Sequence, residues 1–204
     1  MVLKNREAYP DICFKVLADL EENLPEHLAY HCLEHTIDVA NVCDFYIDHY
    51  AISKQMAELI RIAAISHDYG YMDSPIDHEA KSIEKITPLL KEHKYTDKEI
   101  DLIGGMIMAT KIPQRPTNLY EEILADADLD YLGRGDYDEL SSRLLKEFLY
   151  YDVVSNQKEW LDAQIKFLEI HRYHTDLAQK ERIKTKLEKL KELKEDRYKL
   201  NGTP

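Results

Sequence analysis

The chain has 204 residues, of which 44% are hydrophobic and 32% charged, with only 6 glycines and 7 prolines. This length allows one domain with a full hydrophobic core, and the composition excludes a disordered chain and disfavours a turn-rich β fold. The formal net charge of -12 disfavours a nucleic-acid polymer or an acidic membrane surface as partner, because binding to either usually needs a basic surface.

Apolar residues recur at helical spacing along most of the chain, and no segment shows the alternation of a β-strand. In chain order, the first predicted helices run from Ile12 to near Pro25, from about Tyr30 to Tyr50, and from a Ser53 cap to His67-Asp68. The next two run from an Asp77 cap through Leu90 and from a Thr96–Glu99 capping box through Met108. The last four are predicted at roughly 119–132, 137–150 and 156–172, and from Thr175 onward. The sequence therefore predicts an all-α, single-domain helical bundle with an additional C-terminal helix.

The C-terminal segment is dense in Lys and Glu and carries only a thin apolar stripe, made of Ile183, Leu187, Leu190 and Leu193. This pattern predicts an amphipathic helix that packs on the edge of the domain, with a homodimer through this helix as the alternative. The predicted division is a helical domain over residues 1–174 and a C-terminal helix and tail over residues 175–204, part of or appended to the same domain.

Cysteine usage and the absence of long apolar runs bear on the cell compartment. Cys13, Cys32 and Cys43 are odd in number and lack CxxC spacing, which disfavours a disulfide framework. The N-terminal residues have no apolar signal core, and no apolar run approaches membrane-spanning length. We expect a soluble cytoplasmic protein without a membrane partner.

Two histidine-containing motifs lie on predicted helices. His31 and His35 are four residues apart, so on a helix they share a face, although such pairs are often only hydrogen-bonded. His67-Asp68 follows a strongly apolar run, where a buried carboxylate needs a cation, a metal or several donors. The alternative for the second motif is an aspartate that caps the next loop and a histidine that only packs.

A third motif, LADADLDYLG, places Asp126, Asp128 and Asp130 in an otherwise apolar helical segment. On a helix these carboxylates spread over different faces, so at most two of them can point toward a common centre. For each aspartate taken alone, exposure to solvent is the alternative.

The combination of these motifs resembles the HD-domain superfamily of metal-dependent phosphohydrolases, over roughly residues 25–150. The motifs are Tyr30-His31-x-x-x-His35-Thr36, then His67-Asp68, then the later aspartate. The resemblance implies these metal ligands: His35, His67, Asp68 and Asp128, with Asp126 as the alternative to Asp128. Asp128 is preferred because, as in the family pattern, it follows a small residue and precedes a large one. The resemblance also implies that Asp68 and His31 are catalytic, with His31 as the proton donor.

Two imidazoles and two carboxylates would leave open positions on a divalent ion, which would lower the pKa of water from about 15.7 toward 7. Relatives with two ions supply extra histidines, whereas this chain offers His78 but Thr110 at the next such place, so one ion is predicted. Manganese, iron, nickel, cobalt, zinc and magnesium all remain candidates. His31, with an ordinary pKa of about 6.5, suits protonation of a leaving oxygen.

The predicted activity is hydrolysis of a small phosphate ester, with a nucleotide as one candidate. The acidic chain then needs local cations or other donors at the site, and the candidates for substrate binding are His78, Lys111, Arg115 and Arg134. Solvated surface is the alternative for each of these cations. The alternative for the whole chain is a non-catalytic regulatory or scaffolding module with a structural metal.

Overall fold

The computed structural model describes residues 2–201 of the chain. Within this range the chain forms nine α-helices, three short 3-10 helices and no β-strand. The α-helices are α1 (Asp11–Asn23), α2 (Leu33–His49), α3 (Lys54–Ser66), α4 (His78–Glu92), α5 (Asp97–Ala109), α6 (Leu119–Asp128), α7 (Tyr137–Tyr150), α8 (Gln157–Ile170) and α9 (Asp176–Asn201), and the 3-10 helices are η1 (Arg6–Ala8), η2 (Tyr69–Met72) and η3 (Asp130–Gly133). The predicted all-α class is confirmed.

The chain divides after Asp128 into two compact units. The first unit contains α1 to α6, and the second contains η3 and α7 to α9. The predicted boundary between residues 174 and 175 stays a prediction.

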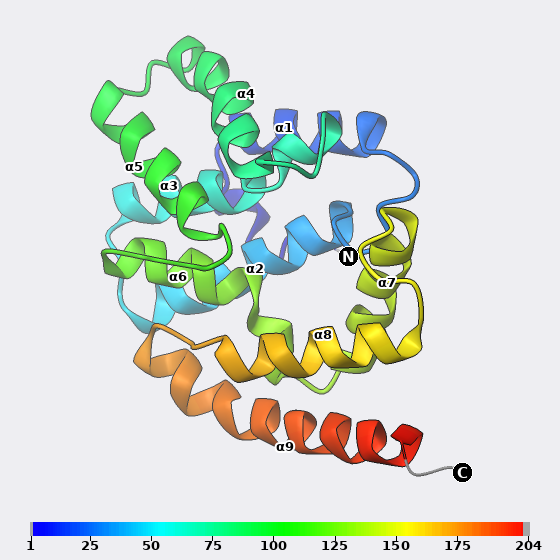
Figure 1. Cartoon of the computed structure of the whole chain (residues 1–204). Coiled ribbons are helices and arrows are strands. Elements are labelled where there is room, and N and C mark those ends of the chain that lie inside the picture. Colours follow the sequence, from blue (N-terminus) through cyan, green and yellow to red (C-terminus); the bar gives the residue numbers. More distant parts are fainter. Residues whose placement is uncertain (1, 202–204) are drawn as a thin grey trace. The chain divides into compact units, whose positions relative to one another are not determined.

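Helix α3 is the centre of the first unit. It packs against α1, α2, α5 and α6, and Figure 1 shows it surrounded by these elements. Every residue from Leu59 to Ser66 is buried, which is typical of a helix that is apolar on all sides. The chain after this helix therefore starts from the interior of the unit, where His67 is fully buried.

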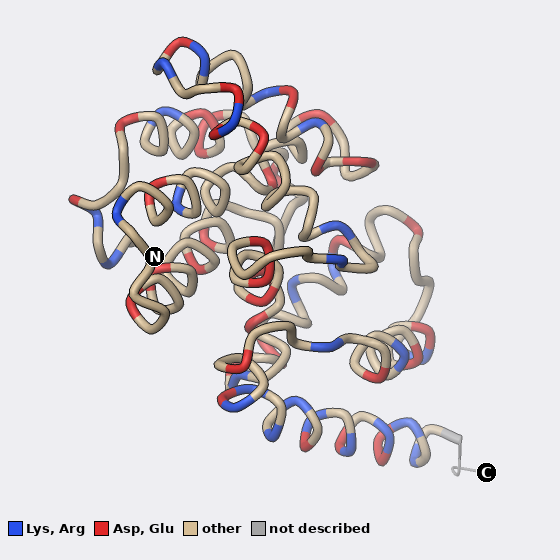
Figure 2. The backbone as a smooth tube through the Cα atoms, turned by 90° about the vertical axis from the view of Figure 1, so that its left-hand side faces the viewer, with Lys and Arg blue, Asp and Glu red and all other residues tan. Residues whose placement is uncertain are grey.

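The second unit is built around the packing of α9 on α8 and η3. Lys and Arg alternate with Asp and Glu along α9, as Figure 2 shows. Of the predicted apolar stripe, Leu193 is buried but Leu187 is 54% exposed, so the stripe is only partly covered within the unit.

Three helices begin with the N-terminal cap that the sequence predicts. The Ser53 side chain accepts a hydrogen bond from the Met56 backbone N–H at the start of α3. Thr96 and Glu99 form a complete capping box at α5. Asn156 caps α8 by accepting from the Glu159 backbone N–H. These helices begin where a side-chain oxygen satisfies an otherwise unpaired N–H.

Two local expectations were wrong, and the predicted Asp77 cap was right in its position but not in its hydrogen bond. Helix α2 begins at Leu33, so His31 lies before the helix, where its ring stacks on Tyr71. Helix α6 ends at Asp128, and the chain continues in the separate turn η3. Asp77 precedes α4 in the left-handed region, with φ 53°, and its side chain makes no cap hydrogen bond. That carboxylate pairs instead with the Lys111 ammonium at 2.6 Å.

None of the helices within residues 2–201 combines the length and the apolarity needed to cross a lipid bilayer.

Candidate metal centre

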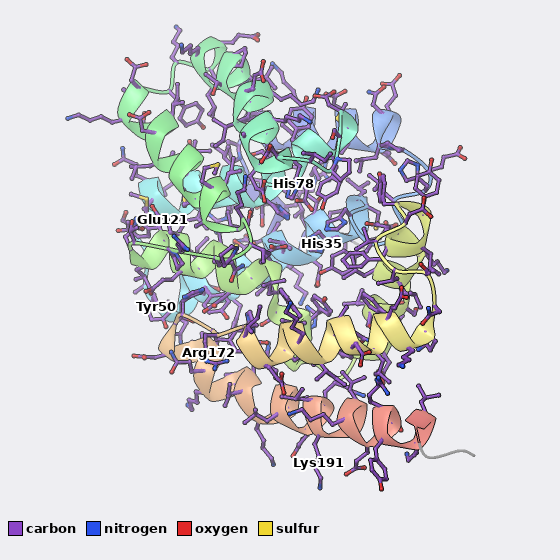
Figure 3. All side chains as sticks on the ribbon, in the orientation of Figure 1. His35, Tyr50, His78, Glu121, Arg172 and Lys191 are labelled. Atoms are coloured by element: carbon purple, nitrogen blue, oxygen red, sulfur yellow. The ribbon has the colours of Figure 1, made fainter. Side chains whose placement is uncertain are left out.

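The centre of the first unit contains a group of histidine and aspartate side chains from three chain segments, all buried except Asp128, which is half-buried. His35 lies in the first turn of α2, His67 and Asp68 follow the last residue of α3, and Asp128 is the last residue of α6. All three segments meet because α3 packs against α2 and α6, and α2 packs against α6. Figure 3 labels His35 at this place.

The ligand atoms of this group face one another. The Nε2 atoms of His35 and His67 lie 3.3 Å apart, and Asp128 Oδ1 lies 3.2 Å from His35 Nε2 and 3.6 Å from His67 Nε2. One ligand atom from each of these three residues lies within 4.8 Å of the others. Asp68 Oδ2 lies 3.2 Å from His67 Nε2 and 3.5 Å from His35 Nε2. The four predicted ligands are therefore brought together.

The orientation of the His67 ring is fixed from outside the centre. Its Nδ1 atom lies 2.8 Å from the backbone carbonyl of Ala64. Because a carbonyl only accepts, Nδ1 must carry the hydrogen of this bond, so the neutral ring presents the lone pair of Nε2 to the centre. This is the tautomer that a metal ligand requires.

The donor set fits a divalent ion. Asp68 Oδ2 is buried and accepts no hydrogen bond, although burying a carboxylate oxygen without a donor is costly. Two imidazole nitrogens and two carboxylate oxygens are ligands for first-row divalent metals. The group can therefore hold a metal ion, and a cation would satisfy the orphaned oxygen of Asp68.

The electrostatics agree with a site built for positive charge. Burial opposes charging of His67, but the carboxylates of Asp68 and Asp128 outweigh it and raise the pKa of this imidazole well above its ordinary value. Burial likewise opposes ionisation of both aspartates, yet the neighbouring histidines hold the pKa of each carboxyl below its usual range. Both aspartates are thus ionised at neutral pH.

A family model described as HD domain matches residues 32–130, which include all four of these residues. This part of the chain is an HD domain. Comparisons with curated proteins and with solved structures gave no match. Members of this superfamily are generally metal-dependent hydrolases.

Three aromatic rings, those of His31, Tyr71 and His78, lie beside the candidate metal ligands. Tyr71 stacks on His31 with ring centroids 4.2 Å apart, and its hydroxyl lies 3.0 Å from His31 Nε2. The Tyr71 ring also lies 4.2 Å from the His78 ring, and the His31 and His78 rings lie 6.4 Å apart. His78, labelled in Figure 3, places Nε2 3.4 Å from Asp68 Oδ1 and 3.5 Å from Glu79 Oε1. His31 and His78 therefore both approach the predicted ligands, and Tyr71 contacts both of their rings.

The basic residues predicted to bind substrate differ in their surroundings. Lys111 pairs with Asp77, the residue before His78, so it lies at the start of α4 but its charge is already partnered. Arg115 is exposed on the loop before α6. Arg134 belongs to the second unit, where its guanidinium binds both carboxylate oxygens of Asp136. As substrate-binding residues of the HD domain they stay predictions.

The group of converging ligand atoms includes Asp128 and not Asp126. Asp126 is fully buried in α6 two positions earlier, and two positions on a helix turn its side chain to another face.

Sequence analysis did not single out the contacts that support this centre. The contacts of Tyr71 with His31 and His78 depend on the fold of the loop, so no spacing in the sequence indicates them. Ser82 on α4 was not considered, although its hydroxyl bonds to the backbone on both sides of Asp68. The one signal available in the sequence was that Ser82 is a polar residue on the apolar face of an amphipathic helix.

Proposed function

We propose that this HD domain hydrolyses small phosphate esters with one divalent ion held by His35, His67, Asp68 and Asp128. The observation that carries the proposal is the buried Oδ2 of Asp68, which accepts no hydrogen bond and lies beside two imidazole nitrogens and a second carboxylate. A purely structural cluster of this kind would gain from a hydrogen-bond donor at that oxygen.

A divalent ion bound there would acidify water and neutralise the charge of a phosphoryl group. In the hydrolysis, water releases a proton to the solvent and its oxygen forms a bond to phosphorus, while the bond from phosphorus to the leaving oxygen breaks and that oxygen takes up a proton. His31 is the proposed donor of this proton, because it lies beside His35 but outside the ligand set, with ring centroids 5.9 Å apart. The stack with Tyr71 restricts the orientations of its ring.

His78, whose ring contacts both Tyr71 and His31, is the proposed contact for the substrate. Its Nδ1 lies 3.2 Å from the Pro75 carbonyl, which accepts its hydrogen and fixes the ring. The proposed substrate class is a small phosphate ester, with nucleotides as one group to test. A nucleic-acid polymer is disfavoured by the net charge of -12.

The proposed compartment is the cytoplasm. Cys13, Cys32 and Cys43 are all free thiols, and free thiols persist in a reducing compartment.

Metal analysis combined with a phosphatase screen over phosphate monoesters, diesters and nucleotides tests the proposal. The variants are Asp68→Asn and, as matched control, Asp73→Asn, which makes the same change at an exposed residue paired with Lys85. We expect wild type and control to bind one ion per chain and to hydrolyse at least one ester, and Asp68→Asn to lose both properties. A wild-type chain that binds no divalent ion refutes the proposal. Metal binding without turnover of any ester would favour a regulatory module.

A further inference from the structure

Ser82 joins helix α4 to the turn that carries Asp68. Its hydroxyl donates a hydrogen bond to the His67 carbonyl at 2.7 Å and accepts one from the Gly70 N–H at 2.8 Å. Ser82 is 0% exposed, so water does not compete for either group. One side chain therefore satisfies the backbone groups that precede and follow Asp68-Tyr69.

The same turn is in close backbone contact with α4. A Cβ atom on Gly70 would lie 2.1 Å from the His78 carbonyl oxygen and 2.8 Å from the Ser82 backbone nitrogen. Such distances are far inside van der Waals contact, so only glycine lets the turn approach the helix this closely. The packing leaves little space for the turn to shift if the Ser82 bonds are kept.

Asp68 uses its two carboxylate oxygens on two sides of the site. Oδ2 faces His67 Nε2 at 3.2 Å, and Oδ1 faces His78 Nε2, which belongs to the first residue of α4, at 3.4 Å. The plane of the carboxylate is therefore set by the backbone of the turn relative to α4. Ser82 holds that backbone on both sides.

We propose that Ser82 is a positioning residue of the metal centre, which sets the orientation of the Asp68 carboxylate through the His67–Gly70 turn. Ser82 touches neither a ligand atom nor a substrate and acts through the backbone. The inference rests on the metal centre in the proposed function but not on phosphate ester hydrolysis, so the two can fail separately.

Titration of the full-length chain with Co²⁺ tests the inference, because the visible absorption of this ion reports both affinity and ligand geometry. The variant is Ser82→Ala, and the matched control is Ser66→Ala. Ser66 is equally buried and adjoins His67, but its hydroxyl donates only to the Ile62 carbonyl of its own helix. We expect Ser82→Ala to weaken Co²⁺ binding about 10- to 100-fold, as loss of an outer partner of a ligand does, and to change the absorption spectrum. Ser66→Ala should bind Co²⁺ within about twofold of wild type.

Ser82→Cys is the second variant in case alanine prevents folding, since the thiol has nearly the same size and hydrogen-bonds weakly. It should fold and show an intermediate loss of Co²⁺ affinity. A folded Ser82→Ala or Ser82→Cys chain with wild-type affinity and spectrum overturns the inference, as does an equal loss in Ser66→Ala. A wild-type chain that binds no Co²⁺ also overturns it. The expected changes in Co²⁺ affinity and spectrum, found in a protein that hydrolyses no phosphate ester, would support the positioning role of Ser82 and refute only the proposed reaction.

Discussion

The Nε2 atoms of His35 and His67 lie 3.3 Å apart with a carboxylate oxygen of Asp128 within 3.6 Å of both. His67 donates to the Ala64 carbonyl through its other nitrogen, so its Nε2 atom is directed at His35. Two nitrogen atoms this close need a proton or a cation between or beside them, because their lone pairs would otherwise repel each other. A cation bound beside this pair would remove that repulsion.

The choice between neighbouring aspartates can be tested with Asp128→Asn and Asp126→Asn, which keep the side-chain volume and remove the charge. Of these two aspartates, only Asp128 has an oxygen in the converging group. Removal of a residue that hydrogen-bonds a metal ligand lowers metal affinity by up to roughly 100-fold, and Asp128→Asn should lower it by more than that. Asp126→Asn should leave metal affinity within about threefold of wild type, since it supplies no ligand atom. Calorimetric metal titration measures both. A larger loss for Asp126→Asn would exchange the two roles.

Gly70→Ala tests the close approach of the turn to α4. The new methyl group would meet the His78 carbonyl oxygen at 2.1 Å, and we expect the free energy of unfolding to fall by at least about 1–3 kcal/mol. Gly135→Ala is the matched control, because a Cβ there has no neighbour within 4 Å and neither glycine has a positive φ. Urea denaturation compares them. Equal stability of the two variants would show that the turn can move away from α4.

Arg61 of α3 and Asp44 of α2 form a buried ion pair, so the cost of removing Arg61 should depend on whether Asp44 is still present. The guanidinium Nε lies 2.7 Å from Asp44 Oδ1, and Arg61→Met would leave the buried carboxylate without its cation, at a cost of about 3–5 kcal/mol. The double variant Arg61→Met/Asp44→Leu should recover most of this loss, because the Tyr9 hydroxyl can still donate to the Ala40 carbonyl. Denaturant unfolding of the wild type, of Arg61→Met and Asp44→Leu singly, and of the double variant completes the cycle. A double variant as unstable as the single one would contradict the prediction.

The same pair has a pH dependence of known sign. Burial raises the pKa of Asp44, and Arg61 opposes that rise. Without Arg61 the folded chain holds the carboxyl proton to higher pH than the unfolded chain does, so stability falls as pH rises. The destabilisation by Arg61→Met should therefore shrink in acid.

Lys186 gives a second pH-dependent contribution, in the second unit. Burial, helped by the charge of Arg172, lowers the pKa of this ammonium from 10.5 to about 8. Between these values the unfolded chain binds a proton that the folded chain has lost, so the unfolding free energy should rise with pH. In Lys186→Met this rise should be absent, while Arg172 still donates to the His171 carbonyl at 2.9 Å. Parallel pH profiles for the two chains would refute the lowered pKa.

Much of this architecture could be predicted because it depends on local signals. Apolar spacing indicated the helices, and capping side chains such as Ser53 and Thr96 placed two of the helix starts correctly. The ligand group was predicted from the combination of motifs, since no single histidine or aspartate is specific by itself.

Other features depend on contacts between segments that no spacing encodes. The start of α2 was wrong because His31 stacks on Tyr71, which lies 40 residues away. The role of Ser82 depends on two backbone atoms of a turn 12 to 15 residues earlier. A tertiary hydrogen bond to the main chain has no side-chain partner in the sequence, so pattern analysis has nothing to match.

The separation of the ligands along the chain also sets an order of events during synthesis. His35 and Asp128 are 93 positions apart, so a nascent polypeptide that ends anywhere before α6 lacks one of the four ligands. On the ribosome, the complete centre can first form after α6 has left the exit tunnel. Loading of the proposed metal would thereby be a late event, and an arrested, shorter product of translation would hold the ion less tightly than the finished chain.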